Sequence, residues 1–392
     1  MKYLLAVCVG ILAIMRGFAL PSATWLPADV DFVAVTIPDQ GKDTAAQRAW
    51  EVAFTKVDPD LKNQFCTVIP PALFTEQPQI ATLLQALFGV STDNKQTATR
   101  SLTLGVVMPK SPEQIHSGKG VLFIENPTLD IGAVDRALQA LLDEVDLREQ
   151  CDLSRQGDWR LITLTPPHHN SLFGYRAVPQ GLMIAFAQDL PTLEAWLASP
   201  KLKTEQPLSQ VFSCVKQSND GAFILKDLAA LAKRFASTKE QQELLAMQAP
   251  WLFNTHQLFY QVKCAQNAFT GLFSAVTDNA ESAGQLKNNL EMYRLLLAQM
   301  VLPSAFKTQQ TALGQFLLED VQITTQGSAL HLTFKLTPER GAAIYQAFKT
   351  LQERQAMQFN ARFVPDEEND ETSTKQMTSE EAQAILDGLD GK

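Results

Sequence analysis

The chain has 392 residues, 45% of them hydrophobic, and this length exceeds what one hydrophobic core usually covers, so two domains are expected. Its net charge of -9 is concentrated at one end: residues 366–392 carry nine acidic residues and two lysines, and the rest of the chain has a net charge of only -2. This nearly neutral body lacks the basic surface that nucleic-acid binding requires, so we exclude that class of function.

Residues 1–19 have the three parts of a secretory signal peptide: Lys2, an apolar run from Tyr3 to Met15, and small residues that end at Ala19. The apolar run has 13 residues, whereas a membrane-spanning helix needs roughly 20. We therefore predict cleavage after Ala19 and export to the periplasm or the extracellular space, including the periphery of the outer membrane. The mature chain is expected to have no transmembrane span. Because Arg16 is unusual in a signal peptide, an uncleaved anchor is the alternative.

The first half of the mature chain, residues 20–205, shows the hydrophobic patterns of alternating strands and helices. The opening strand 30–37 has apolar residues on both faces, which is typical of a strand covered on both sides. A helix from Asp43 and a partly helical stretch to residue 90 follow it. The remaining predictions are strands at 101–108 and 120–125, a helix at 131–145, strands at 159–165 and 182–187, and a short helix at 191–198.

The second half, residues 206–360, repeats this order. A strand at 221–226 precedes a helix to about residue 237, and strands at 256–264 and 268–277 come next. Asp278 and Glu281 form a capping-box pattern at the start of a long amphipathic helix. A helix around 305–318, a hairpin at 321–336 and a last helix that begins with Pro338 complete this half.

We interpret the two halves as related repeats. Residues 178–197 and 324–345 share a Gln-Gly turn, an apolar strand that ends near a Phe, and a helix that begins with Pro. Because the strands come in adjacent pairs with short turns, the predicted fold class is α+β, a mostly antiparallel sheet covered by helices. Apolar and polar residues alternate along 329–336, so we expect one face of this sheet to meet helices and the other to be open to water and available for binding.

The C-terminal end changes in composition. Residues 361–377 are polar and charged and are expected to form an acidic, disordered linker. Residues 378–392 begin with a second capping-box pattern and are expected to form a short helix. Its apolar stripe consists of Ala382, Ile385 and Leu389, which suit docking into a groove. A terminal helix without a binding role is the alternative.

Three segments carry a resemblance: LPADVDFVAV (26–35), GLMIAFAQDLPTLEAWL (181–197) and FSAVTDNAESAGQLKNNLEMYRLLL (273–297). In these the chain resembles a loose group of uncharacterised exported bacterial proteins. Their mature chains begin with a Leu-Pro-Ala-Asp turn and an apolar strand, and large duplicated α+β domains follow. The resemblance spans about residues 26–355 and implies an exported protein with this fold. It implies no catalytic residue.

Four cysteines remain after signal cleavage, in a compartment that is expected to be oxidising: Cys66, Cys151, Cys214 and Cys264. Disulfides among them are one expectation, with all three connectivities open. The other is that a cysteine such as Cys264, on the apolar side of its strand, is only a small buried hydrophobe. No CxxC pair occurs, so no structural zinc site is expected.

Sequence motifs of common enzyme classes are absent: the chain contains no GxSxG, HExxH, GxxxxGK[ST] or GxGxxG. His168 and His169 form the one local histidine cluster, and adjacent residues of an extended chain point in opposite directions, so a shared metal ion is not expected. The leading hypothesis is a non-enzymatic envelope protein that binds an unknown protein or envelope polymer without a cofactor. The alternative is an exported hydrolase around these histidines, with Asp158 or Asp189 supplying a carboxylate to a metal.

Overall fold

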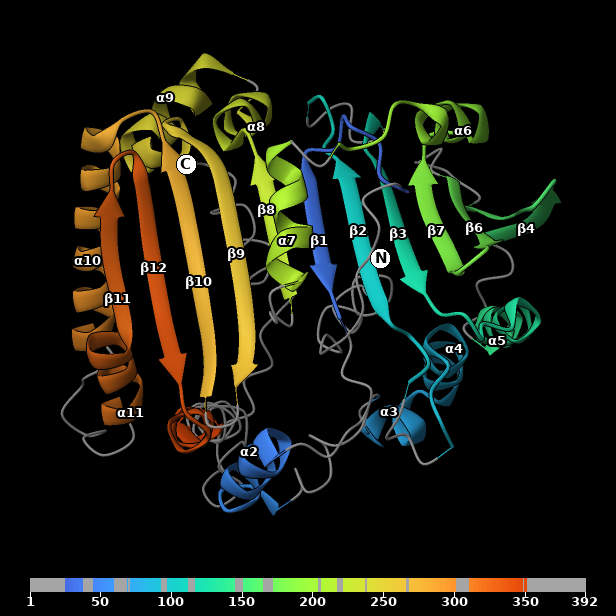
Figure 1. Cartoon of the computed structure of the whole chain (residues 1–392), viewed down its shortest axis with the longest axis horizontal. Coiled ribbons are helices and arrows are strands. Elements are labelled where there is room, and N and C mark those ends of the chain that lie inside the picture. Colours follow the sequence, from blue (N-terminus) through green and yellow to red (C-terminus); the bar gives the residue numbers. More distant parts are fainter. Residues whose placement is uncertain are drawn as a thin grey trace, which may run out of the picture. The chain divides into compact units, whose positions relative to one another are not determined.

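One twelve-stranded sheet runs through the chain, in the order β11-β12-β10-β9-β8-β1-β2-β3-β7-β6-β5-β4 (Figure 1). Every pair of neighbouring strands is antiparallel, as the sequence predicts for this α+β fold. The computed structural model describes residues 25–37, 45–59, 69, 71–92, 97–111, 117–144, 151–164, 172–203, 206–216, 221–236, 238–265, 268–300, 310–347, 349 and 350. The chain divides into a unit of Met1–Gln346, to which all the elements named below belong, and a unit of Ala347–Lys392.

The strands of the first half lie close to their predicted positions, with two additions. They are β1 (Phe32–Thr36), β2 (Ser101–Val107), β3 (Lys119–Glu125), β4 (Cys151–Gln156), β5 (Trp159–Leu164), β6 (Leu172–Val178) and β7 (Gly181–Ala187). Strands β4 and β6 are not predicted by the hydrophobic pattern of the sequence. The helices of this half are α2 (Ala45–Thr55), α3 (Pro71–Glu76), α4 (Pro78–Phe88), α5 (Ile131–Glu144) and α6 (Leu190–Ala198).

The second half contains the longest strands and the longest described helix. Its strands are β8 (Gly221–Lys226), β9 (Thr255–Ala265), β10 (Ala268–Thr277), β11 (Val321–Gln326) and β12 (Ala329–Leu336). Its helices are α7 (Gln210–Lys216), α8 (Leu228–Phe235), α9 (Lys239–Gln248), α10 (Ala280–Met300) and α11 (Gln310–Gln315), and residues 338–346 are also helical. The sequence analysis did not predict α7 or α9.

The strand order is mirrored about the central pair β1 and β8. Moving outward, one side reads β1-β2-β3-β7-β6 and the other reads β8-β9-β10-β12-β11. On each side a glycine faces a phenylalanine ring across neighbouring strands: a Cβ atom on Gly120 would lie 2.2 Å from Phe186, and one on Gly271 would lie 2.2 Å from Phe334. The predicted repeats thus share one sheet, while their boundaries and common origin stay predictions.

Helices and a chain segment cover the sheet unevenly. On one face, α4 and α5 bury a core that includes Leu102, Ile124 and Leu182, and α10 contributes Leu286 to a second core with Val321, Ile323 and Leu330. On the opposite face, residues 25–30, α6 and α7 cover the middle and the first half of the sheet with the largest core. We call the face beneath α4, α5 and α10 the helix-covered face.

The segment LPADVD, residues 26–31, links the start of β1 to neighbouring segments of the chain through hydrogen bonds and a buried side chain. Leu26 is fully buried, and its carbonyl oxygen accepts a hydrogen bond from Leu202 N at 2.8 Å. Asp29 Oδ1 accepts a hydrogen bond from Trp196 Nε1 of α6 at 2.8 Å. Asp31 Oδ2 accepts one from Met108 N at 2.9 Å. The opening motif therefore stabilises the sheet, as expected for a covered first strand.

Candidate functional site

The face of β9–β12 opposite the helix-covered face has no described helix over it in Figure 1. We call it the open face. Along β11 and β12 its residues alternate with less exposed ones, which confirms the alternation predicted for the last hairpin. The central residues of the open face are Phe259, Gln261 and Lys263 on β9, Thr270, Leu272 and Ser274 on β10, His331, Thr333 and Lys335 on β12, and Gln322 and Thr324 on β11.

A hollow of about 400 Å³ lies on this open face where all four strands meet. The strand register places Thr270 of β10 directly between Lys263 of β9 and Lys335 of β12. Gln261, Leu272, Gln322 and Thr333 line the same hollow. Thr270 Oγ1 donates to the carbonyl oxygen of Lys263 at 3.3 Å. The hollow thus combines two ammonium groups with hydroxyl and amide groups.

The charge of the open face differs from that of the chain. None of its outward side chains, in the list above, is a carboxylate, although the chain as a whole has a net charge of -9. Asp320 reaches the rim of the hollow, where Arg340 Nε lies 3.3 Å from its Oδ2, and the same guanidinium also pairs with Glu319 through Nη2 at 3.1 Å. Within the described part of the chain, neither Lys263 nor Lys335 forms an ion pair. The open face is therefore locally basic.

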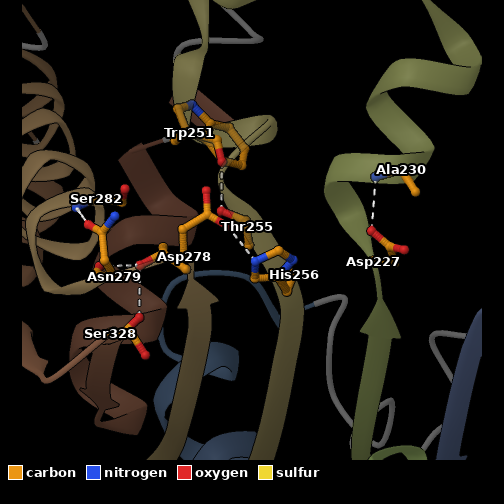
Figure 2. Close-up of polar contacts among 10 residues, drawn as sticks. Asp227, Ala230, Trp251, Thr255, His256, Asp278, Asn279, Ser282 and Ser328 are labelled. Carbon is orange, nitrogen blue, oxygen red and sulfur yellow. Dashed lines mark hydrogen bonds and ion pairs between the residues drawn. The ribbon is translucent and has the colours of Figure 1, made fainter.

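A second polar cluster lies where β9 begins and β10 ends (Figure 2). The imidazole Nε2 of His256 contacts Asp278 Oδ1, and Asp278 N donates to Asn254 O at 3.0 Å. Asn279, not Asp278, caps α10, because its Oδ1 accepts the Ser282 N–H at 2.9 Å. The predicted capping box at Asp278 is therefore wrong: the carboxylate of Asp278 turns instead to the histidine.

The His256–Asp278 pair does not form the pattern of a hydrolytic triad. The side chains of the pair are 55% and 42% exposed, and no hydroxyl or thiol group among the described residues contacts the imidazole. The nearby hydroxyl of Thr255 donates to the Trp251 carbonyl oxygen at 2.7 Å (Figure 2). Among the described residues the pair therefore lacks the nucleophile that such a triad requires.

The helix-covered face holds a further charged cluster between α5 and the sheet. Asp135 of α5 accepts hydrogen bonds from Arg160 Nε at 2.7 Å and from the Tyr175 hydroxyl at 2.8 Å. Burial, and then the hydrogen bond to the Asp135 carboxylate, raise the pKa of Tyr175 far above its usual range. A tyrosine held neutral in this way anchors α5 and is not suited to accept a proton.

Some of the predicted site residues lie outside the described ranges, and the others lie within them. His168, His169, Cys66, Ala382, Ile385 and Leu389 lie outside the described residues, as do the predicted signal peptide, acidic linker and C-terminal helix. Asp158 lies exposed in the turn between β4 and β5. Asp189 caps α6, since its Oδ1 accepts the Thr192 N–H at 2.7 Å. In the described ranges no group of three or more His, Cys, Asp or Glu side chains is arranged to hold a metal ion.

The cysteines leave the disulfide expectation open. Cys151 is a free thiol on the edge strand β4, and Cys214 packs against the largest core from α7. Burial raises the pKa of both thiols, which lowers their reactivity. Cys264 lies in β9. Disulfide pairing stays a prediction.

Comparison with known proteins gives no family. No family model matches the chain, and no curated protein matches it. Three crystal forms of the protein TP0453 show weak structural similarity, each match covering 84% of this chain. Crystal form III has 8% sequence identity and a TM-score of 0.41 over 99% of TP0453, form I has 9% and 0.37 over 98%, and form IV has 8% and 0.35 over 97%. At these TM-scores the similarity has no bearing on function, and the resemblance to exported bacterial proteins stays a prediction.

Among the helices that the structure describes, none is both long enough and apolar enough to cross a membrane.

Proposed function

We propose that this chain is an exported, non-enzymatic protein of the bacterial envelope that binds a macromolecular partner through the open face of β9–β12. The main observation in support of this proposal is the open face. On their other side β10, β11 and β12 pack against α10, and β9 packs against α8, so the sheet holds the outward side chains on a rigid frame. A rigid frame favours binding because few groups lose conformational freedom when the partner arrives.

Side-chain exposure supports the same choice of surface. The open face has five exposed side chains: Lys263, Gln322, Thr324, Thr333 and Lys335. On β11 the residues that alternate with Gln322 are buried, and on β12 the neighbours of Thr333 and Lys335 are half-buried. Leu272 lies between them and lines the hollow. A polar face with an apolar residue at its centre has the composition of a protein interface with a small core and a polar rim.

A steric block on the open face tests the proposal. The full chain, immobilised and exposed to an envelope extract, is expected to retain a partner that mass spectrometry identifies. The substitution Thr333→Trp is expected to abolish retention of that partner, because an indole would fill the hollow while still suiting a strand. Thr163→Trp, at an exposed position of β5, is the matched control and is expected to retain the partner.

The C-terminal helix predicted at 378–392 provides the competing surface. A chain that ends at Phe363 lacks this helix and the acidic segment. It is expected to retain the partner as well as the full chain does. Loss of the partner on truncation, together with normal binding by Thr333→Trp, would move the binding surface to the C-terminal segment. No partner retained by either chain would contradict the proposal altogether.

A further inference from the structure

We propose that the partner presents an acidic polypeptide segment to the open face, and that carboxylates of this segment contact Lys263 and Lys335 on either side of Thr270. This inference rests on the proposed function, because it names the chemistry of the group that the open face receives. It predicts an interaction that weakens with salt and requires negative charge on the partner.

Uncompensated charge is the first argument. Lys226, the lysine on the neighbouring strand β8, lies 3.9 Å from the Asp31 carboxylate. Lys263 and Lys335 have no such partner in the described part of the chain, and both are exposed. The carboxylate at the rim of the hollow, Asp320, shares the Arg340 guanidinium with Glu319, at 3.3 Å and 3.1 Å. Lys263, Lys335 and Arg340 outnumber these two carboxylates, so the surface attracts an acidic group, and like charges on a wrong partner would be repelled.

The spacing of the two lysines is the second argument. They are separated by two strand intervals, so their Cα atoms lie about 10 Å apart, and both side chains are long enough to reach a group above Thr270. Thr333 and Gln261 flank Leu272 in register and offer a hydroxyl and an amide beside it. Glutamine and threonine side chains both donate and accept hydrogen bonds, which suits the backbone amides of a bound polypeptide.

The absence of a stacking surface favours a polypeptide over an acidic polysaccharide or nucleotide. Phe334 is the one aromatic residue that lines the hollow, and its ring packs against Phe316 on the helix-covered face with 6.2 Å between ring centroids. It also covers Gly271 from that side. Phe259 lies on the open face but packs against the largest core and does not line the hollow, so no described aromatic ring is presented to the hollow as a platform for a sugar or a base.

The size of the open face favours a segment over a whole domain. Four strands about 4.8 Å apart and about seven residues long cover about 400 Å², which is half of the roughly 800 Å² that each partner buries in a standard interface. A short acidic segment fills this area, whereas a globular domain would extend over the surrounding helices.

Fluorescence anisotropy with labelled peptides tests the inference on the full chain. The probes are a peptide of four Glu-Gly repeats, its Gln-Gly counterpart, and polygalacturonate as an acidic polysaccharide. We compare the wild-type chain with Lys263→Gln/Lys335→Gln. The control variant, Lys203→Gln/Lys233→Gln, removes the same charge at exposed positions outside the open face. Thermal unfolding followed by circular dichroism checks that all the chains are folded.

The expected result is that the Glu-Gly peptide binds the wild-type chain and the control variant equally, and binds Lys263→Gln/Lys335→Gln about tenfold more weakly. The Gln-Gly peptide is expected not to bind. Equal binding of the Glu-Gly peptide by both double variants would overturn the inference, as would no binding by the wild-type chain. Binding of polygalacturonate without the peptide would also overturn it, in favour of a polysaccharide.

The partner retained from the envelope extract separates this inference from the proposed function. If the open face binds the partner but the bound segment is not acidic, Thr333→Trp loses that partner while Lys263→Gln/Lys335→Gln retains it. If the open face is not the binding surface, both variants retain it.

Discussion

Asp31 joins three elements of the centre of the sheet, and its removal should destabilise the whole fold. Its side chain is only 9% exposed and accepts the Met108 N–H at 2.9 Å. Lys226 Nζ lies 3.9 Å from one carboxylate oxygen, and Arg234 Nη1 lies 3.7 Å from the other. The carboxylate thus links the start of β1 to the end of β2, the end of β8 and α8.

The expected cost follows from which groups lose their partner. In Asp31→Ala the partly buried Met108 N–H loses a charged acceptor, a loss of about 1.5–3 kcal/mol. Lys226 and Arg234 are 37% and 33% exposed, so water partly replaces the carboxylate and the two ion pairs add about 1 kcal/mol. We therefore expect Asp31→Ala to lower the free energy of unfolding by about 2–4 kcal/mol. In Asp31→Asn the amide oxygen still accepts the N–H, and the cost should be about half as large.

Thermal unfolding of the purified chain measures this difference. For the roughly 270 residues that the structure describes, 1 kcal/mol corresponds to about 1.8 °C in Tm, so Asp31→Ala is expected to lower Tm by about 4–7 °C. Arg136→Ala is the control, because Arg136 and Asp130 form an ion pair with side chains 74% and 65% exposed, and its Tm should change by less than about 1 °C. Equal shifts for the two variants would refute the reasoning.

Two further predictions concern turns and caps. Gly181→Ala should abolish stable folding, because a Cβ atom there would lie 1.9 Å from the Ile124 carbonyl oxygen. Gly157→Ala should cost only about 1 kcal/mol of left-handed backbone strain, because nothing lies within 4 Å of the added Cβ atom. Soluble yield and denaturant unfolding compare the two variants. Asp189→Ala should cost about 1 kcal/mol, because the side chain caps α6. The Thr192 N–H lowers the pKa of Asp189 in the folded chain, so this contribution is complete above the unfolded pKa and is lost as pH falls through the folded pKa. A difference between wild type and Asp189→Ala that persists in strong acid would contradict this assignment.

Hydrophobic periodicity was sufficient to predict much of the fold. The strand around Val33 and Val35 and the alternating hairpin at 321–336 have side-chain patterns that local structure alone explains. Hydrophobic periodicity failed to predict strands whose formation depends on tertiary contacts and not on a local side-chain pattern. Strand β6 contains Gly174, which has no side chain to contribute to a pattern and lies beneath Trp159. Strand β4 is polar and lies at the edge of the sheet, so it does not need two apolar faces.

The candidate site was predictable only in outline. Alternation along 329–336 indicates that one face of the hairpin is open, and it places Lys335 on that face. It does not show that Lys263 lies on the same face two strands away, because this depends on the register of β9, β10 and β12. The capping of α10 shows a similar limit. Asp278 and Asn279 are both good capping residues, and the position of His256 explains why Asn279 caps the helix.

Hydrogen exchange of the full chain, measured with and without the partner that it retains, tests binding through the open face most directly. We expect the partner to slow exchange in the peptides that cover β9, β10 and the hairpin β11–β12, and to leave β4 and β5 at the opposite end of the sheet unchanged. Slower exchange confined to β4 and β5, or to residues 378–392, would contradict the proposed function.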